Sequence, residues 1–328
     1  MGTYLSQFGS ILGTLPVANG RVYWVSPSAT YTVNGATVTA SDGNDGLHPS
    51  RPLRTINRAA ALVAANVGDV IVLLPGTHTP QNSAGTATSV PLNVAGVTIT
   101  GLPFMAARHS NSRMPAQGMK RRTIVSATLA DELFNITAAD VEVAFLHFTL
   151  TAAADPSQQA IDISAAGHRA HIHDCTFSIE VGTSDTAVMG IELLGASDQV
   201  AIDHCHFYLE NNTGPAIRLI GAATNTMVEY STFEWGRSAT ALDDFIEVAT
   251  TAVGQTFRDL DFISNNTSNV VDCIDIAGAT GDEATLIARC LFPVGSDPVE
   301  PADPADVSFA SNILAEVSGG TGGTAVVS

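Results

Sequence analysis

Apolar residues recur along the middle of the chain with a period of 26 to 30 residues, and each period ends on a phenylalanine. In the earlier units apolar residues lie seven, five and two positions before the phenylalanine, as Ala170, Ile172 and Cys175 do before Phe177, and the units that end on Phe233, Phe262 and Phe292 keep this pattern in part. Alternation by two predicts a strand with one buried face, and the single step of three allows a corner that keeps the same face inward. The repeated phenylalanines are Phe148, Phe177, Phe207, Phe233, Phe262 and Phe292, and Phe104 ends a seventh run of the same kind.

A second pair of apolar residues lies 12 to 18 residues before most of these phenylalanines. The pairs are Phe134 and Ile136, Ile161 and Ile163, Ile191 and Leu193, Ile217 and Leu219, Ile246 and Val248, and Ile274 and Ile276. Two or three short strands per unit, joined by Gly, Asn, Asp and Thr, are typical of one coil of a parallel β-helix. The sequence therefore predicts an all-β solenoid of about seven or eight coils, stacked about 4.8 Å apart.

The ends of the chain differ from the repeat. Residues 55–67 carry apolar side chains at helical spacing, with a glycine just after them, and we expect a short helix that caps the solenoid before a first strand at 70–74. Two short strands around an Asn-Gly turn are expected upstream. The predicted organisation is an uncharged arm at 1–20, N-terminal strands and a turn at 21–53, the β-helix at 54–292 with a basic insertion at 105–123, and a Pro/Asp linker with a Gly-rich tail at 293–328.

The charge balance limits the partners. The chain has 14 Lys and Arg against 32 Asp and Glu, a net charge of −18, which argues against nucleic acid or an anionic membrane as the main partner. The first twenty residues carry no charge, so we expect no signal peptide and folding in a cytoplasm. The four cysteines are then expected to stay thiols.

Two similar stretches, HRAHIHDCTFSIE and DQVAIDHCHFYLE, look like metal or hydrolase sites. Their cysteines fall in an inward column of small buried side chains formed by Cys175, Cys205 and Cys290. A disulfide between Cys175 and Cys205 is the minor alternative.

The polar residues of these stretches are predicted to lie outside the core. We expect His173, Asp174, Asp203 and His204 at a corner of the coil and His171 and His206 on outward positions. The favoured interpretation is a solvated stripe, and a zinc or nickel site is the alternative. Likewise, Asp42 to Gly46 resembles a calcium loop, but Gly46 stands where an oxygen ligand is required, so a turn is favoured.

Several segments together carry a resemblance to a known group. LPVANGRVYWVSPS, SDGNDGLHPSRPLRTINRAAALV, GDVIVLLPGTHT, VTITGLPF and the repeated I-x-x-C-x-F coils resemble tailed-bacteriophage virion proteins with a right-handed parallel β-helix. The resemblance spans most of residues 15–292. Its D-G-N-D-G-L-x-P and G-D-x-I-x-x-x-P-G-T elements are shared with the wider pectate-lyase-like superfamily, so they specify the fold better than the function.

The resemblance implies a structural protein of the virion, most simply a head decoration protein on the capsid surface, made in the host cytoplasm and assembled as a homotrimer. The expected partner is the major capsid protein, with no cofactor, nucleic acid or membrane. The alternatives are a tail fibre or tailspike that binds host glycans, and a polysaccharide lyase or hydrolase. Candidate contacts with the capsid or with sister subunits are Tyr4, Leu5, Phe8, Ile11, Leu12 and Leu15 in the arm and Arg108, Arg113, Lys120, Arg121 and Arg122 in the insertion.

The sequence alone favours a protein that is not an enzyme. Lyase chemistry requires carboxylates and a basic side chain on one face, and no arginine of the coils could be grouped with three acids from the sequence. Asp243 and Asp244 resemble a hydrolase pair, but neighbours on a strand point to opposite faces, so we expect a turn there instead. A glycan-binding surface would use Tyr208, Tyr230 and Trp235 on outward or corner positions.

Overall fold

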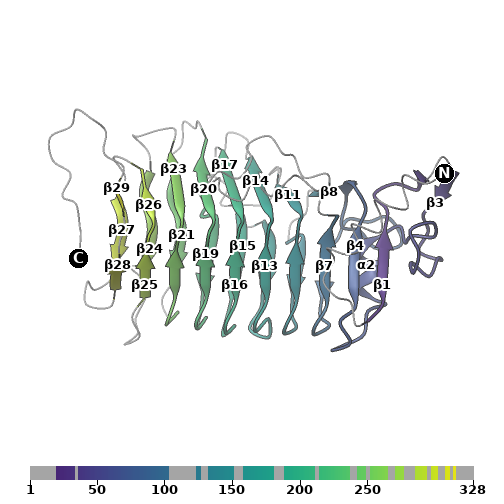
Figure 1. Cartoon of the computed structure of the whole chain (residues 1–328), viewed down its shortest axis with the longest axis horizontal. Helices are drawn as coiled ribbons and strands as arrows, with labels where there is room; N and C mark the ends of the chain where they lie inside the picture. The colour runs from purple at the N-terminus through teal and green to yellow at the C-terminus, as the bar shows by residue number, and fades with distance from the viewer. Residues whose placement is uncertain are drawn as a thin grey trace.

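The chain folds as a parallel β-helix, and the prediction of fold class is confirmed (Figure 1). The computed structural model describes residues 20–33, 36–102, 123–126, 132–150, 158–180, 188–210, 214–236, 242–248, 252–264, 270–276, 285–293, 297–301, 307–310 and 313–314. Each coil from Val70 to Pro301 contributes one strand to each of three parallel sheets, which hold ten, nine and eight strands in all. The ten-stranded sheet is longer than the seven or eight coils expected.

From Val70 onward the strands of the three sheets follow one another in rotation along the chain. The ten-stranded sheet contains β1 (Val22–Val25), β4 (Val70–Leu73), β7 (Thr98–Gly101), β10 (Glu142–Ala144), β13 (His171–His173), β16 (Ala201–Asp203), β19 (Met227–Glu229), β22 (Thr256–Arg258), β25 (Thr285–Ala288) and β28 (Val307–Ala310). The nine-stranded sheet contains β5 (Gly76–His78), β8 (Thr123–Ser126), β11 (His147–Leu150), β14 (Thr176–Glu180), β17 (His206–Glu210), β20 (Thr232–Trp235), β23 (Asp261–Ser264), β26 (Leu291–Phe292) and β29 (Ile313–Leu314). The eight-stranded sheet contains β6 (Val90–Leu92), β9 (Phe134–Ile136), β12 (Gln159–Ile163), β15 (Met189–Leu194), β18 (Ile217–Ile220), β21 (Leu242–Val248), β24 (Val270–Ile276) and β27 (Asp297–Pro301).

The core consists of columns of equivalent side chains, as the period predicts. The six phenylalanines from Phe148 to Phe292 are at most 2% exposed. Successive rings of this column lie 4.6–5.3 Å apart with planes within 18° of parallel. Cys175, Cys205 and Cys290 are buried at 1–2% exposure, at the inward positions where the sequence places them. Phe104, the first predicted member of the ladder, lies outside the described residues.

Two corners of each coil are made by residues in the left-handed backbone region. Eight residues before the phenylalanine the corner residues are Asp140, Arg169, Gln199 and Asn225, and three residues before it they are Phe145, Asp174, His204, Tyr230, Asp259 and Arg289. Their φ angles of 47–59° cost roughly 1–2 kcal/mol each for a residue with a Cβ. The second corner explains the step of three in the apolar pattern, because it falls between two inward residues.

The N-terminal cap is shorter than predicted. Helix α2 (Ile56–Ala60) covers only part of 55–67, and it begins after Thr55, whose hydroxyl accepts the backbone N–H of Arg58 at 3.2 Å. The carboxylate of Asp69 accepts the backbone N–H of Ala64, which holds the following segment outside a helix. Within the described residues no helix has the length and hydropathy needed to cross a bilayer.

The solenoid is also longer than the predicted 54–292. Strand β1 pairs in parallel with β4, so the first coil starts before the capping helix. The sequence predicts two short strands between residues 21 and 40, and the structure has three there: β1, and the antiparallel hairpin of β2 (Thr30–Val33) and β3 (Ala36–Thr39). At the other end, β27, β28 and β29 extend all three sheets into the segment expected to be a linker. Strands can pair through their backbones where the apolar period has ended. The apolar period alone therefore places both ends of the solenoid too far inward.

Replacing Phe177 by Ala should lower the free energy of unfolding by about 3–5 kcal/mol, because it removes a ring stacked on both sides and leaves a cavity. Urea denaturation followed by circular dichroism measures this. Ser178→Ala, at the next and outward position, is the matched control and should change stability by about 0.5 kcal/mol or less. Equal effects of the two substitutions would contradict a dominant role of the phenylalanine column.

Candidate functional site

An outward column of polar side chains runs across the eight-stranded sheet. On each strand the residue between the two inward apolar residues points away from the core, and neighbouring strands pair these residues in register. We call this set the acid column; its members are Asn135, Asp162, Glu192, Arg218, Glu247 and Asp275. Four of the six are acids and one is an arginine, so the fold concentrates charge along one line.

The centre of the acid column is tied together by close contacts. Arg218 Nε lies 2.8 Å from Glu247 Oε2, and its Nη1 lies 3.8 Å from Glu192 Oε1. The other carboxylate oxygen of Glu192 accepts the side-chain amide of Gln159 at 2.8 Å. Glu192 and Asp162 are only 5% and 8% exposed although they face away from the core. The sequence failed to group an arginine with three acids, and here Arg218 shares a column with four, of which Glu192 and Glu247 lie in register on the neighbouring strands.

Burial changes the acidity of this column. It raises the pKa of Asp162 to about 7, with the charges of Glu132 and Glu192 adding to the effect. Burial likewise raises the pKa of Glu192, although Arg218 opposes the shift. Asp162 Oδ1 is buried and has no hydrogen-bond partner within the described part of the chain. A carboxyl that exchanges its proton near neutral pH beside a guanidinium-paired acid can act as a general acid or base.

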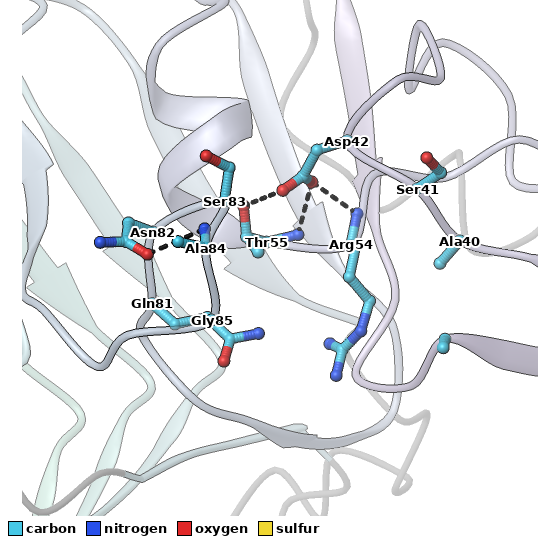
Figure 2. Close-up of a pocket in the computed structure, with 11 residues that line it drawn as sticks. Ala40, Ser41, Asp42, Arg54, Thr55, Gln81, Asn82, Ser83, Ala84 and Gly85 are labelled. Atoms are coloured by element: carbon cyan, nitrogen blue, oxygen red, sulfur yellow. Dashed lines mark hydrogen bonds between the residues drawn. The ribbon is translucent and has the colours of Figure 1, made fainter.

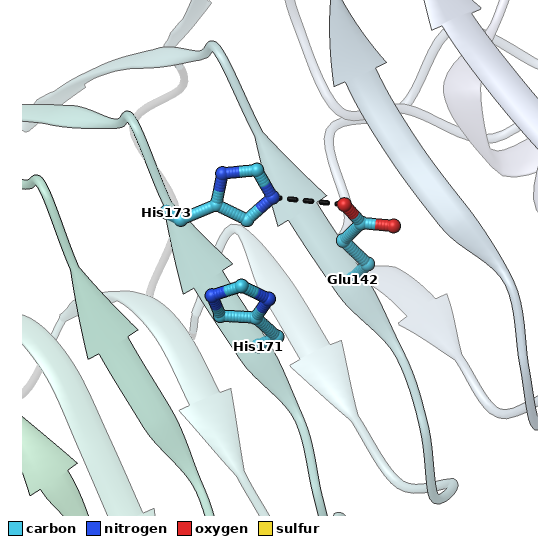
Figure 3. Close-up of side chains that lie close together, drawn as sticks. All are labelled: Glu142, His171 and His173. Carbon is cyan, nitrogen blue, oxygen red and sulfur yellow. Dashed lines mark hydrogen bonds and ion pairs between the residues drawn. The ribbon is translucent and has the colours of Figure 1, made fainter. Parts of the chain in front are cut away.

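A second cluster lies on the ten-stranded sheet, and Figure 3 shows three of its side chains. We call Glu142, His171, His173 and Asp203 the histidine patch. His173 Nε2 donates to Glu142 Oε1 at 2.8 Å, and the rings of His171 and His173 stack with centroids 4.3 Å apart. His171 Nε2 donates to Asp203 Oδ2 on the next strand. The predicted stripe exists, but its placement needs one correction: His173 and Asp203 lie on strands, and only Asp174 and His204 form the corner.

The histidine patch is held by ionised groups. Burial disfavours the charged form of His173, but hydrogen bonds to Asp174 and Glu142 outweigh it and raise its pKa to about 10. The hydrogen bond from His173 lowers the pKa of Glu142. The pKa of Asp203 is also lowered, because hydrogen bonds from His171 and His204 outweigh its burial. The patch is therefore a network of carboxylates and imidazoles exposed along one side.

A polar pocket near the N-terminal end has a structural role (Figure 2). The Asp42 carboxylate accepts the backbone N–H groups of Arg54 and Thr55 at 2.9 Å each and the Thr55 hydroxyl at 2.8 Å. Asp42 thus fixes the residue that begins α2. Gly46 has a φ of +68°, and a Cβ there would lie 2.7 Å from Leu53. The turn interpretation of the D-G-N-D-G segment is confirmed by the 3.0 Å bond from Asn44 N–H to Ser41 O.

The remaining residues singled out in the sequence have mixed outcomes. The arm and insertion residues proposed as contacts lie outside the described residues, so the structure does not place them. Asp243 and Asp244 lie within β21, not in a turn before it. Trp235, expected on the surface, is fully buried, because it follows Phe233 by two positions on the same strand and shares its inward face. Tyr230 lies at a corner and is 48% exposed, as expected.

Comparisons with solved structures identify the fold. A pectin methylesterase bound to a hexasaccharide matches with a TM-score of 0.55 and 13% identity over 90% of this chain and 91% of that chain. The pectin methylesterase from Yersinia enterocolitica matches with a TM-score of 0.53 and 11% identity over 81% and 92%. Geobacillus virus E2 ORF18 matches with a TM-score of 0.39 and 12% identity over 88% and 67%. No protein-family model and no curated protein sequence matches the chain.

The prediction that the chain is not an enzyme is wrong on these findings. Four solved structures that match with TM-scores above 0.5 are pectin methylesterases, so this architecture is one that carries enzymes. At 11–14% identity the likeness shows the fold and leaves the reaction open. The prediction failed because it assumed scattered acids, whereas the acids and Arg218 converge on one face.

Carbon-13 NMR of carboxyl groups should show one side chain that titrates near pH 7 and disappears in Asp162→Asn. A carboxyl whose pKa is raised on folding holds its proton better in the native state, so its contribution to stability is present below about pH 4 and is lost as the pH rises to about 7. The stability of Asp162→Asn relative to the parent chain should therefore increase between pH 5 and pH 8. A flat difference would show that Asp162 has an ordinary acidity.

Proposed function

We propose that this chain is a surface protein of a bacteriophage particle, in which the β-helix serves as a rigid rod. The sequence resemblance of residues 15–292 supports this assignment, and the observation that carries it is the unbroken column of stacked phenylalanines through consecutive coils. Such a column stabilises the rod without any ligand. Within the particle we propose head decoration, with the major capsid protein as partner and a homotrimer as the assembly.

Attachment to the particle is proposed to use the uncharged arm and the basic insertion. The arm offers apolar side chains such as Phe8 and Leu12 with no charge to desolvate. The insertion holds 5 of the 14 basic residues of a chain with a net charge of −18, so it can contact acidic surfaces that the rest of the protein repels.

Mass spectrometry of purified particles should find this chain in a copy number comparable with that of the major capsid protein. Replacing Phe8 and Leu12 together by Ser should reduce its incorporation, because the apolar contact surface is lost. Ser6→Ala in the same arm is the control and should leave incorporation unchanged. Particles that lack the chain altogether would refute the assignment to the virion, and a handful of copies would move it from head to tail.

A second candidate function is the binding or cleavage of a polysaccharide along the acid column. The observation that favours it is the register of Asp162, Glu192 and Arg218 on adjacent strands. One strand spacing of about 4.8 Å lies close to the separation of about 5–5.5 Å between the two carboxyl groups of retaining glycosidases. Asp162 would supply an exchangeable proton, and Arg218 would face an anionic sugar.

A panel of neutral and uronate-containing polysaccharides should be tested for binding, for new reducing ends, for ester hydrolysis and for unsaturated products. If one is a substrate, Glu192→Gln should lower turnover by about 10²–10⁴-fold, because it removes an ionisable group and keeps the shape. Arg169→Ala is the control, since Arg169 forms its ion pair with Asp140 at a corner away from the column. Turnover that survives Asp162→Asn and Glu192→Gln would place the chemistry elsewhere.

A further inference from the structure

The histidine patch combines three potential metal ligands from two adjacent strands. His171 and His173 lie two positions apart on β13, and Glu142 faces them from β10 in register with His171. One ligand atom from each of the three residues lies within 4.8 Å of the others. Ligands about 2.0–2.1 Å from a tetrahedral zinc ion lie about 3.4 Å apart, so small rotations of these side chains would bring them to coordination distance.

Hydrogen bonds to Asp203 and Asp174 decide which ring nitrogens face the proposed cation. His171 Nε2 is hydrogen-bonded to Asp203 Oδ2, and His173 Nδ1 is hydrogen-bonded to Asp174 Oδ2 at 3.1 Å. The ligand atoms would then be His171 Nδ1 and His173 Nε2. His173 Nε2 is hydrogen-bonded to Glu142, the third proposed ligand, as Figure 3 shows. A carboxylate that orients the far nitrogen of each ligating histidine is the usual outer arrangement of metal sites.

We propose that Glu142, His171 and His173 bind a divalent transition-metal ion, with zinc the best match, and that Asp203 and Asp174 orient the two histidines. Two imidazoles and one carboxylate form a donor set known for zinc, with a fourth position left for water or a further ligand. The side chains of His171, Glu142 and His173 are 43%, 29% and 16% exposed, so an ion can enter from solvent.

The negative charge around the two histidines would favour the binding of a cation. The carboxylates of Glu142, Asp203 and Asp174 all lie in hydrogen-bond contact with the two imidazoles. In the metal-free state the proton between His173 Nε2 and Glu142 Oε1 stands where the metal would bind, and metal binding releases it. This site lies on the ten-stranded sheet and the acid column lies on the eight-stranded sheet, so the inference is independent of the proposed function.

The test is zinc binding by the full chain at pH 8, measured by competition with a chromophoric chelator after removal of bound metal. The expected result is one zinc ion per chain. His171→Ala and His173→Ala should each weaken binding by more than about 100-fold, and the positioning variant Asp203→Asn should weaken it by about 10–100-fold. With Co²⁺ as the probe, the parent chain should show the visible absorption of a four-coordinate site, and both histidine variants should lose it.

Two control variants separate loss of a ligand from a general loss of histidine or of folding. His48→Ala removes an exposed histidine of the N-terminal loops and should leave the affinity unchanged. Glu142→Gln keeps the shape of the side chain, so it should lose affinity with an unchanged circular dichroism spectrum if His173→Ala disturbs folding. The proposal is overturned if the parent chain binds no stoichiometric zinc, or if His171→Ala and Glu142→Gln bind zinc as tightly as the parent chain does.

Discussion

The structure depends on one constraint, the in-register hydrogen bonding of each coil to the next. Parallel strands about 4.8 Å apart place every side chain directly beside its equivalent in the neighbouring coils. A position within the coil therefore becomes a column along the solenoid. Phe177 and Phe207 stack for this reason, since β14 and β17 pair them directly. The residues that a side chain contacts in space are therefore set by its position in the coil, and much less by the residues next to it in the sequence.

The same constraint produces the charged surfaces. The strand spacing fixes the distance between equivalent side chains of adjacent coils. Acids at equivalent positions therefore lie close together and must be protonated or paired with a basic side chain. Arg218 pairs with Glu247, whereas Asp162 has a raised pKa and an oxygen that lacks a partner among the described residues. Natural folds tolerate such a cost mainly where the group has a role, and this is the physical ground for the second proposed function at the acid column. The histidine patch resolves the same crowding differently, by alternating carboxylates and imidazoles across three strands.

The inward half of this structure was predictable, because apolar side chains with a fixed period leave a direct trace in the sequence. The outward half left a trace as well: Asp162, Glu192, Arg218 and Glu247 each precede their phenylalanine by 15 residues. That alignment predicts their register. It does not predict the burial of Asp162 or the pairing of Arg218, because these depend on side-chain packing across coils. The left-handed corners cannot be located from residue type either, since Asp174 and Arg289 occupy them as asparagine does. For this reason the sequence places His173 at a corner, one residue too early.

The pairing of β1 with β4, and of each later strand with its equivalent one coil on, has a mechanical consequence. The hydrogen bonds between coils run along the rod axis, while the covalent chain runs around it. Compression along the axis meets stacked rings and backbone in close contact. Tension along the axis acts on the hydrogen bonds of every coil interface in series. We expect a stretched rod to open from one end, one coil at a time. The gain in length of the molecule at rupture then gives the number of coils released.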